Sequence, residues 1–481
     1  MGKEPSLKKN IILSTSYQIL TMITPFITAP YVSRVLGSDG IGIFSYTQSY
    51  ESFFLMFASL GTVAYGTREI ARKRDNLKER SQFFWEIQSL KLITTILVLI
   101  AWFGFSNILS EYKAIFMIMA FNIFANIFDV SWFFAGIERF EYTVYKNTAF
   151  KILSIICIFL FVKNKSDLHI YIIINVLSTS IGHMSMWIGI RKFLAKPDLK
   201  TFKLLPHLKK TLVYFIPTIA VSIYTILDKA LIGVITQNTS ENGYYEQATK
   251  IINMAKSLTF VAMNQVLSSR ISYLFAEKKF DEIKDRINTS IDYILFMGFG
   301  MGFGIYSIAG SFVPMFFGNG YDKVVQLLQL MSPLIIIIGI SYSLSSQYFT
   351  PAGLQALSAR FVIVGCFVNL VLNVIFIPKL ESAGAVIASV LAETVITGLY
   401  IWHSKEFFKI INIIRLGWKK LIAGLAMLIS MNAVCYLKIT GLALVMLQFL
   451  VGSVVYIGVL VLLRDSIFNL IVTKVKENKR S

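Results

Sequence analysis

The stretch "TAPYVSRVLGSDGIGIFSY" (residues 28–46) places an arginine and an aspartate between two long apolar runs. The run before it reads IILSTSYQILTMITPFI (residues 11–27), and the run after it contains SFFLMFASLGTVA (residues 52–64). With their flanks, these runs approach about 20 residues, the length at which a helix crosses the hydrocarbon of a bilayer. The stretch therefore predicts two membrane-spanning helices joined by a short polar outer loop, and it leaves Arg34 to be explained.

The same pattern continues along the whole chain of 481 residues. The composition is 55% hydrophobic, the mean hydropathy is +0.65, and 15% of the residues are charged. A soluble domain carries charge on about a quarter of its residues. The sequence therefore predicts an all-α polytopic membrane protein.

We count about 14 transmembrane helices by the length criterion. Their expected starts lie near Asn10, Ile41, Phe83, Tyr112, Asn147, Leu168, Thr211, Tyr244, Asn288, Lys323, Leu357, Ser382, Lys419 and Leu442.

The basic residues between the spans indicate the topology. Of the 46 lysines and arginines, 35 lie in the two termini and in the loops after even-numbered spans. Six lie on the other side. Because basic loops remain in the cytoplasm, both termini are expected there. This distribution also accounts for the net charge of +19 without a nucleic-acid partner.

An internal repeat suggests two similar halves. Residues 36–49 and residues 232–250 each contain a glycine at a helix end, a short polar loop, and a glycine closely followed by an aromatic residue where the next helix opens. The predicted organisation is two six-helix lobes around a central cavity, residues 1–210 and 211–402, followed by an extra helix pair and tail in residues 403–481. Repeated halves of this kind are typical of transporters.

The eighth span carries a polar face. Its members advance in helical steps: Glu246, Lys250, Asn253, Ser257, Asn264 and Ser268. A charge inside hydrocarbon costs at least ~2.5–3.5 kcal/mol, so this face is expected to meet water or protein. We favour a water-filled cavity, with Lys256 beside the face, over an internal polar seam between packed helices.

The first span shows a milder version of this pattern. Ser14 and Gln18 share a face with Pro25, and Pro25 and Pro30 both remove backbone hydrogen bonds. Such losses are tolerated where a helix borders a cavity. Arg34 follows these prolines, and the alternative for it is a side chain that reaches the lipid boundary.

Further charged residues fall inside other spans. Lys91 and Lys229 add cations, and the carboxylates are Glu51, Asp129, Asp228 and Glu393. A carboxylate in a bilayer readily takes up a proton, which suits coupling to an H⁺ or Na⁺ gradient. Structural salt bridges are the alternative for each of them.

Several motifs for catalysis or cofactors are missing or misplaced. The sequence has no Walker loop and no Ser-His-Asp arrangement, and its four histidines lack metal spacing. The glycines of "GFGMGFG" (residues 298–304) follow no strand and fit close helix packing. Cys157, Cys366 and Cys435 each lie alone in an apolar run. No metal, no cofactor and no enzymatic activity are expected.

Two passages carry a resemblance to a known family. "PFITAPYVSRVLGSDGIGIFSY" (residues 25–46) and "YTILDKALIGVITQNTSENGYYEQATKI" (residues 224–251) resemble the Wzx-type polysaccharide flippases. These flippases belong to the multidrug/oligosaccharidyl-lipid/polysaccharide exporter superfamily, and the similarity in layout extends over the whole chain.

The resemblance implies a flippase of the bacterial cytoplasmic (inner) membrane. It would move undecaprenyl-diphosphate-linked oligosaccharides by alternating access, for capsule, exopolysaccharide or O-antigen synthesis, beside a polysaccharide polymerase and a chain-length regulator. The basic cavity residues of the family match Arg34, Lys229 and Lys250 by position. We add Lys256 and Lys91 as secondary candidates for binding the diphosphate and sugars.

Three alternatives remain at this point. A multidrug exporter of the same superfamily would favour acidic cavity residues over Lys250 and Lys256. A peptidoglycan-precursor flippase is compatible with the sequence. A membrane scaffold or receptor without transport would not need a lysine-bearing face in the middle of the bundle.

Overall fold

The computed structural model describes residues 7–405, 407–437 and 439–467. Across these residues every regular element is helical, so the predicted all-α polytopic membrane fold is confirmed. Lys438 and the C-terminal tail lie outside the described residues, as do the side chains of Ser14 and Ser268. The chain divides into two compact units, residues 1–230 and 231–481. The lobe limits expected at residues 210 and 402 stay predictions.

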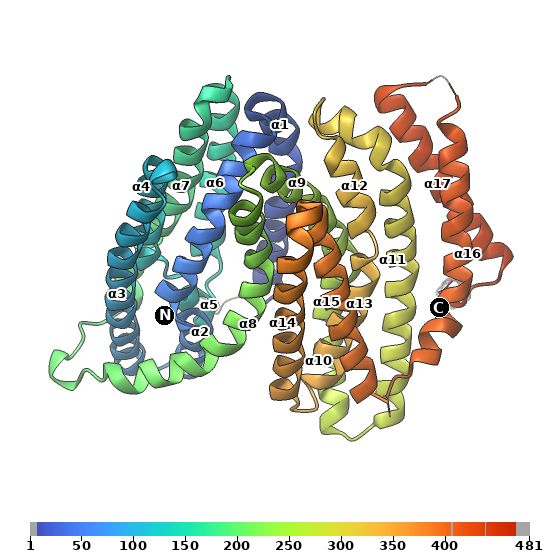
Figure 1. The fold of residues 1–481 in the computed structure, drawn as a ribbon. Coiled ribbons are helices and arrows are strands. Elements are labelled where there is room, and N and C mark those ends of the chain that lie inside the picture. Colours follow the sequence, from blue (N-terminus) through green and yellow to red (C-terminus); the bar gives the residue numbers. More distant parts are fainter. Residues whose placement is uncertain (1–6, 406, 438, 468–481) are drawn as a thin grey trace. The chain divides into compact units, whose positions relative to one another are not determined.

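The first unit contains seven complete α-helices and most of an eighth (Figure 1). Within it, α3 packs on α4, α4 on α7, and α7 on α6. The helices are α1 (Leu7–Ser59), α2 (Thr62–Arg72), α3 (Leu77–Ile108), α4 (Lys113–Ala125), α5 (Ser131–Gly136), α6 (Glu141–Phe161), α7 (Leu168–Ser185) and α8 (Leu204–Thr236).

The second unit begins in the last part of α8. Two π-helices, η6 (Ser257–Val261) and η7 (Ser345–Phe349), interrupt its α-helical segments. Those segments are α9 (Thr239–Lys256), α10 (Ala262–Ala276), α11 (Phe280–Phe317), α12 (Asp322–Met331), α13 (Leu334–Leu344), α14 (Gln355–Leu380), α15 (Ser382–His403), α16 (Ile410–Val434) and α17 (Gly441–Leu462).

The two copies of the sequence repeat turn in different ways. In the first copy α1 consists of two helices that meet directly at a kink, where Gly37 alone is non-helical, at φ 71° and ψ 177°. Glycine adopts positive φ without steric cost, so one residue bends the helix where we predicted a polar loop. That loop prediction is wrong. In the second copy Gly233 lies inside α8, and the turn falls on Gln237 at φ 51°, before Asn238 caps α9.

Nine stretches of the described residues are long and apolar enough to cross a membrane. One of them, residues 15–72, contains both spans predicted around Arg34. The protein is therefore a multi-pass membrane protein, and the count of 14 spans stays a prediction.

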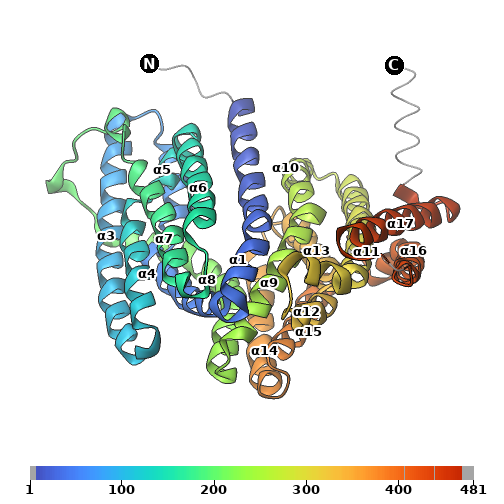
Figure 2. The same ribbon diagram turned by 90° about the horizontal axis from the view of Figure 1, so that it is seen from above.

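The glycines of α11 allow close helix packing, as predicted. A Cβ atom at Gly298 would lie 2.8 Å from Ile336 of α13, and one at Gly300 would lie 3.1 Å from Tyr456 of α17. Both distances are shorter than normal carbon contacts. In Figure 2, α16 and α17 lie beside α11, with which both make extensive contact.

Candidate functional site

The polar face of the eighth span changes direction at a π-helix. The helix α9 carries Glu246 and Lys250, whose side chains form an ion pair at 3.3 Å. After Lys256 the chain enters η6, where hydrogen bonds run i→i+5 and shift the helical phase. Asn253, before the π-helix, is exposed, whereas Asn264, after it, is buried. The regular 3.6-residue spacing used for the sequence prediction does not hold across this segment.

Asn264 belongs to an internal polar seam of the second unit. Gln347 of η7 donates to Asn264 Oδ1 at 2.5 Å and to Ser290 Oγ at 2.7 Å. The Ser290 hydroxyl also lies 3.1 Å from the hydroxyl of Ser343. All four residues are buried, so this part of the face is the packed seam that we named as the alternative to a cavity.

Lys256 and Glu393 lie within electrostatic range of each other. Lys256 ends α9, and Glu393 lies on α15, where only 8% of it is exposed. An opposite charge offsets part of the cost of burying an ion. The arrangement provides a structural reason for both residues, beside the binding and coupling roles predicted for them.

In the first unit, Arg34 is exposed and lies three residues before the kink at Gly37. Gln18 is exposed on the earlier part of α1. Asp228 is buried and Lys229 half-buried, next to each other on α8. Arg34 and Lys229 thus belong to the first unit, and Lys250 belongs to the second.

Lys91 and Asp129 stabilise a break in a membrane helix. Between α4 and α5 three backbone carbonyls leave the regular helix, and each must find a donor because lipid offers none. Side chains supply these donors: Gln88 Nε2 to Ile127 O (2.5 Å), Trp187 Nε1 to Phe128 O (2.9 Å) and Lys91 Nζ to Asp129 O (2.8 Å). The Asp129 carboxylate accepts from the Ser131 amide at the start of α5. Substrate binding by the fully buried Lys91 would require this contact to break.

Glu51 has a neutral hydrogen-bond partner. It lies on α1 with 3% of its surface exposed, and Asn122 of α4 donates to its Oε1 at 2.8 Å. A carboxylate bonded to an amide can gain or lose a proton without leaving a cation unpaired. The surroundings of Glu51 therefore suit the coupling role predicted for it.

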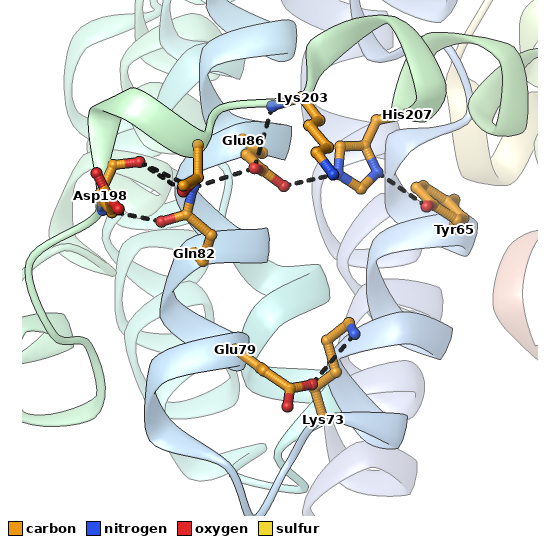
Figure 3. A network of polar contacts seen from close by, with 9 residues as sticks. Tyr65, Lys73, Glu79, Gln82, Glu86, Asp198, Lys203 and His207 are labelled. Atoms are coloured by element: carbon orange, nitrogen blue, oxygen red, sulfur yellow. Dashed lines mark hydrogen bonds and ion pairs between the residues drawn. The ribbon is translucent and has the colours of Figure 1, made fainter.

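Sequence reasoning missed a polar network at one end of the first unit (Figure 3). His207 Nε2 lies 2.7 Å from Glu86 Oε2, and His207 Nδ1 lies 2.9 Å from the hydroxyl of Tyr65. Gln82 exchanges two hydrogen bonds with the backbone of Asp198. These contacts fix the linker between α7 and α8 to the start of α3. No spacing in the sequence indicates that segments more than 100 residues apart meet here.

A buried ion cluster in the second unit was also missed. Lys420 of α16 donates to Asp292 of α11 at 2.7 Å and to Asp465, after α17, at 2.9 Å. Ser466 donates to the other oxygen of Asp292 at 2.6 Å. The side chain of Lys420 has no exposed surface. The count of basic residues places this lysine in a loop, whereas the structure places it inside α16.

The helices and the charges buried among them are those of a polytopic membrane protein. Residues 7–275 match the family described as "Polysaccharide biosynthesis protein", which is more than half of the chain. The protein therefore belongs to this family. The match includes both passages on which the sequence resemblance rested.

Individual relatives agree with this assignment. An O-antigen transporter of Escherichia coli (strain K12) is 24% identical over 82% of this chain and 95% of its own length. A low-salt glycan biosynthesis flippase of Haloferax volcanii is 24% identical over 82% of each chain.

Solved structures show the same fold. The lipid II flippase MurJ, in an inward closed conformation, superposes with a TM-score of 0.75 at 17% identity, covering 95% of this chain and 99% of that one. An inward-facing multidrug transporter of the MATE family reaches a TM-score of 0.62 at 12% identity, covering 81% and 94%.

Proposed function

We propose that this protein is a flippase that carries undecaprenyl-diphosphate-linked oligosaccharides across the bacterial cytoplasmic membrane by alternating access. The observation that carries the proposal is the family match over residues 7–275, which includes Arg34, Lys229 and Lys250. A diphosphate with a sugar chain cannot cross hydrocarbon unaided, because burying its charges is costly. Arginine offers a planar fork of donors to phosphate oxygens, and lysine offers a mobile point charge.

Complementation tests the function directly. In a bacterium deleted for its own polysaccharide flippase but retaining the matching glycosyltransferases, expression of this protein is expected to restore surface polysaccharide. A strain depleted of its lipid II flippase is the control and should not be rescued. Rescue of the control strain alone would instead support a peptidoglycan-precursor flippase, the activity after which the structurally similar MurJ is named.

We further propose that both termini and the linker at residues 191–210 face the cytoplasm, because basic residues concentrate there. The test uses a variant whose three native cysteines are replaced by serine and whose Lys200, which is exposed, is replaced by cysteine. A membrane-impermeant maleimide should label this variant in opened cells and leave it unlabelled in intact cells. Labelling in intact cells would reverse the orientation.

Energy for transport is proposed to come from an H⁺ or Na⁺ gradient, with the four carboxylates Glu51, Asp129, Asp228 and Glu393 as candidates. Glu51→Gln should abolish the sensitivity of transport to an uncoupler, since the amide cannot exchange a proton. Asn122→Asp is the companion variant, because a second carboxylate beside Glu51 should shift the pH at which transport is fastest. If Glu51→Gln transports at the wild-type rate and keeps its uncoupler response, coupling through Glu51 is wrong.

A further inference from the structure

Beside the linker contacts of the first unit lies an open, solvent-accessible pocket of about 660 Å³. One wall comes from the segment between Lys73 and Glu86, around the start of α3. The other wall comes from residues 195–201 of the linker, and His207 of α8 completes the lining. Figure 3 shows Glu86 and His207 at one side of this region and the Lys73–Glu79 pair at the other. Cavities of this size suit small ligands.

The carboxylates that line the pocket already have donors. Glu86 accepts from the Gln82 amide at 3.1 Å and from the Lys203 backbone N–H at 3.2 Å, and its second oxygen meets His207. Asp198 accepts from the backbone N–H of Lys200 at 3.0 Å. Glu79 accepts from Asn76 and from Lys73. Glu86, which is the buried one of the three acids, therefore has both carboxylate oxygens satisfied without a cationic ligand.

The lysines that line the same pocket have donors to spare. Among the described residues, neither Lys78 nor Lys196 has an ion-pair partner, and both are exposed. The third, Lys73, meets Glu79 at 3.5 Å, where the carboxylate is 60% exposed and the pairing is weak. An ammonium group carries three donors and no acceptor. Lys78 and Lys196 therefore offer ammonium donors to an anion that carries several acceptor oxygens.

We propose that this pocket binds a phosphate group, supplied by a lipid headgroup or by a soluble phosphate compound. Phosphate oxygens match ammonium donors through charge-assisted hydrogen bonds. Since Lys78 belongs to α3 and Lys196 to the linker, a phosphate held by both would bridge the two walls. Binding should then strengthen the attachment of the linker to the first unit.

The soluble arm of the test uses inorganic pyrophosphate and the purified full-length protein in detergent at low salt. Calorimetric titration should give saturable binding to the wild type. The double variant Lys78→Ala/Lys196→Ala should bind about ten-fold more weakly or worse, as expected for losing charge-assisted contacts. The matched control is Lys192→Ala/Lys200→Ala, which removes two exposed linker lysines outside the pocket lining and should bind like the wild type.

The lipid arm uses nanodiscs of phosphatidylcholine with or without phosphatidic acid. A rise in melting temperature with phosphatidic acid that the pocket variant loses and the control keeps would identify the lipid headgroup as the source. Pyrophosphate binding with no such rise would identify a soluble phosphate compound. The proposal is overturned if neither probe acts on the wild type, or if both double variants lose binding equally. Because neither arm measures transport, failure here would leave the flippase proposal standing.

Discussion

Lys420→Met is expected to lower the stability of the second unit more than any other single substitution of a charged residue considered above. It leaves Asp292 and Asp465 buried next to each other, with 5% and 2% of their side chains exposed, and without the ammonium that both contact. Removing one partner of a buried ion pair costs about 3–5 kcal/mol. The variant should accumulate poorly in the membrane, and its melting temperature in detergent should be well below that of the wild type.

The neighbouring lysine is the matched control. Lys419 is half-buried and, among the described residues, makes no ion pair; it donates to the backbone of Arg464 and lies 5.7 Å from the centre of the Trp418 ring, so Lys419→Met should melt much closer to the wild type than Lys420→Met does. Neutralising both acids in the Lys420→Met background, with Asp292→Asn and Asp465→Asn, should restore part of the lost stability, because the uncompensated charges disappear. If Lys420→Met and Lys419→Met melt alike, the cluster does not stabilise the second unit.

The stability of this unit therefore depends on contacts that sequence reasoning did not find. Hydropathy is a local property, so the membrane-spanning nature of the chain could be predicted from runs of apolar residues. Lys420 lies at the start of such a run and looks like a topology signal. Its partner Asp292 is 128 residues away, and one chain gives no indication that α16 packs on α11.

Sequence reasoning also could not predict which polar residues of the candidate site share a helix face. The prediction for span 8 assumes a straight helix, and the π-helix at Ser257–Val261 moves Asn264 away from the face of Lys250. After the π-helix, Asn264 contacts Gln347, which lies on another segment 83 residues away, and no spacing in the sequence indicates that contact. The binding roles of Arg34, Lys229 and Lys250 came from motif resemblance, whereas helical spacing already placed Lys250 one turn after Glu246, with which it forms an ion pair.

The second large effect is a loss of transport on substitution of the three cationic residues assigned to substrate binding. Under the proposed function, Arg34→Ala, Lys229→Ala and Lys250→Ala should each reduce polysaccharide export about ten- to a hundred-fold. That range follows from losing one charge-assisted contact worth about 1.5–3 kcal/mol. Arg34→Lys should also impair export, since a point charge does not replace a bidentate fork. The measurement is surface polysaccharide in the complemented strain, normalised to protein in the membrane, with the exposed Lys113→Ala as control.

Lys250 needs one more variant, because it also neutralises Glu246, of whose side chain 11% is exposed. Lys250→Ala could reduce export merely by leaving that carboxylate without its cation. In Glu246→Gln/Lys250→Ala the carboxylate is gone as well, so a purely structural loss should be reversed. If Lys250 contacts the diphosphate, export stays low in the double variant and Glu246→Gln alone retains most of it. Recovery of export in the double variant, or normal export from all three alanine variants at wild-type abundance, would remove the support for a cationic path.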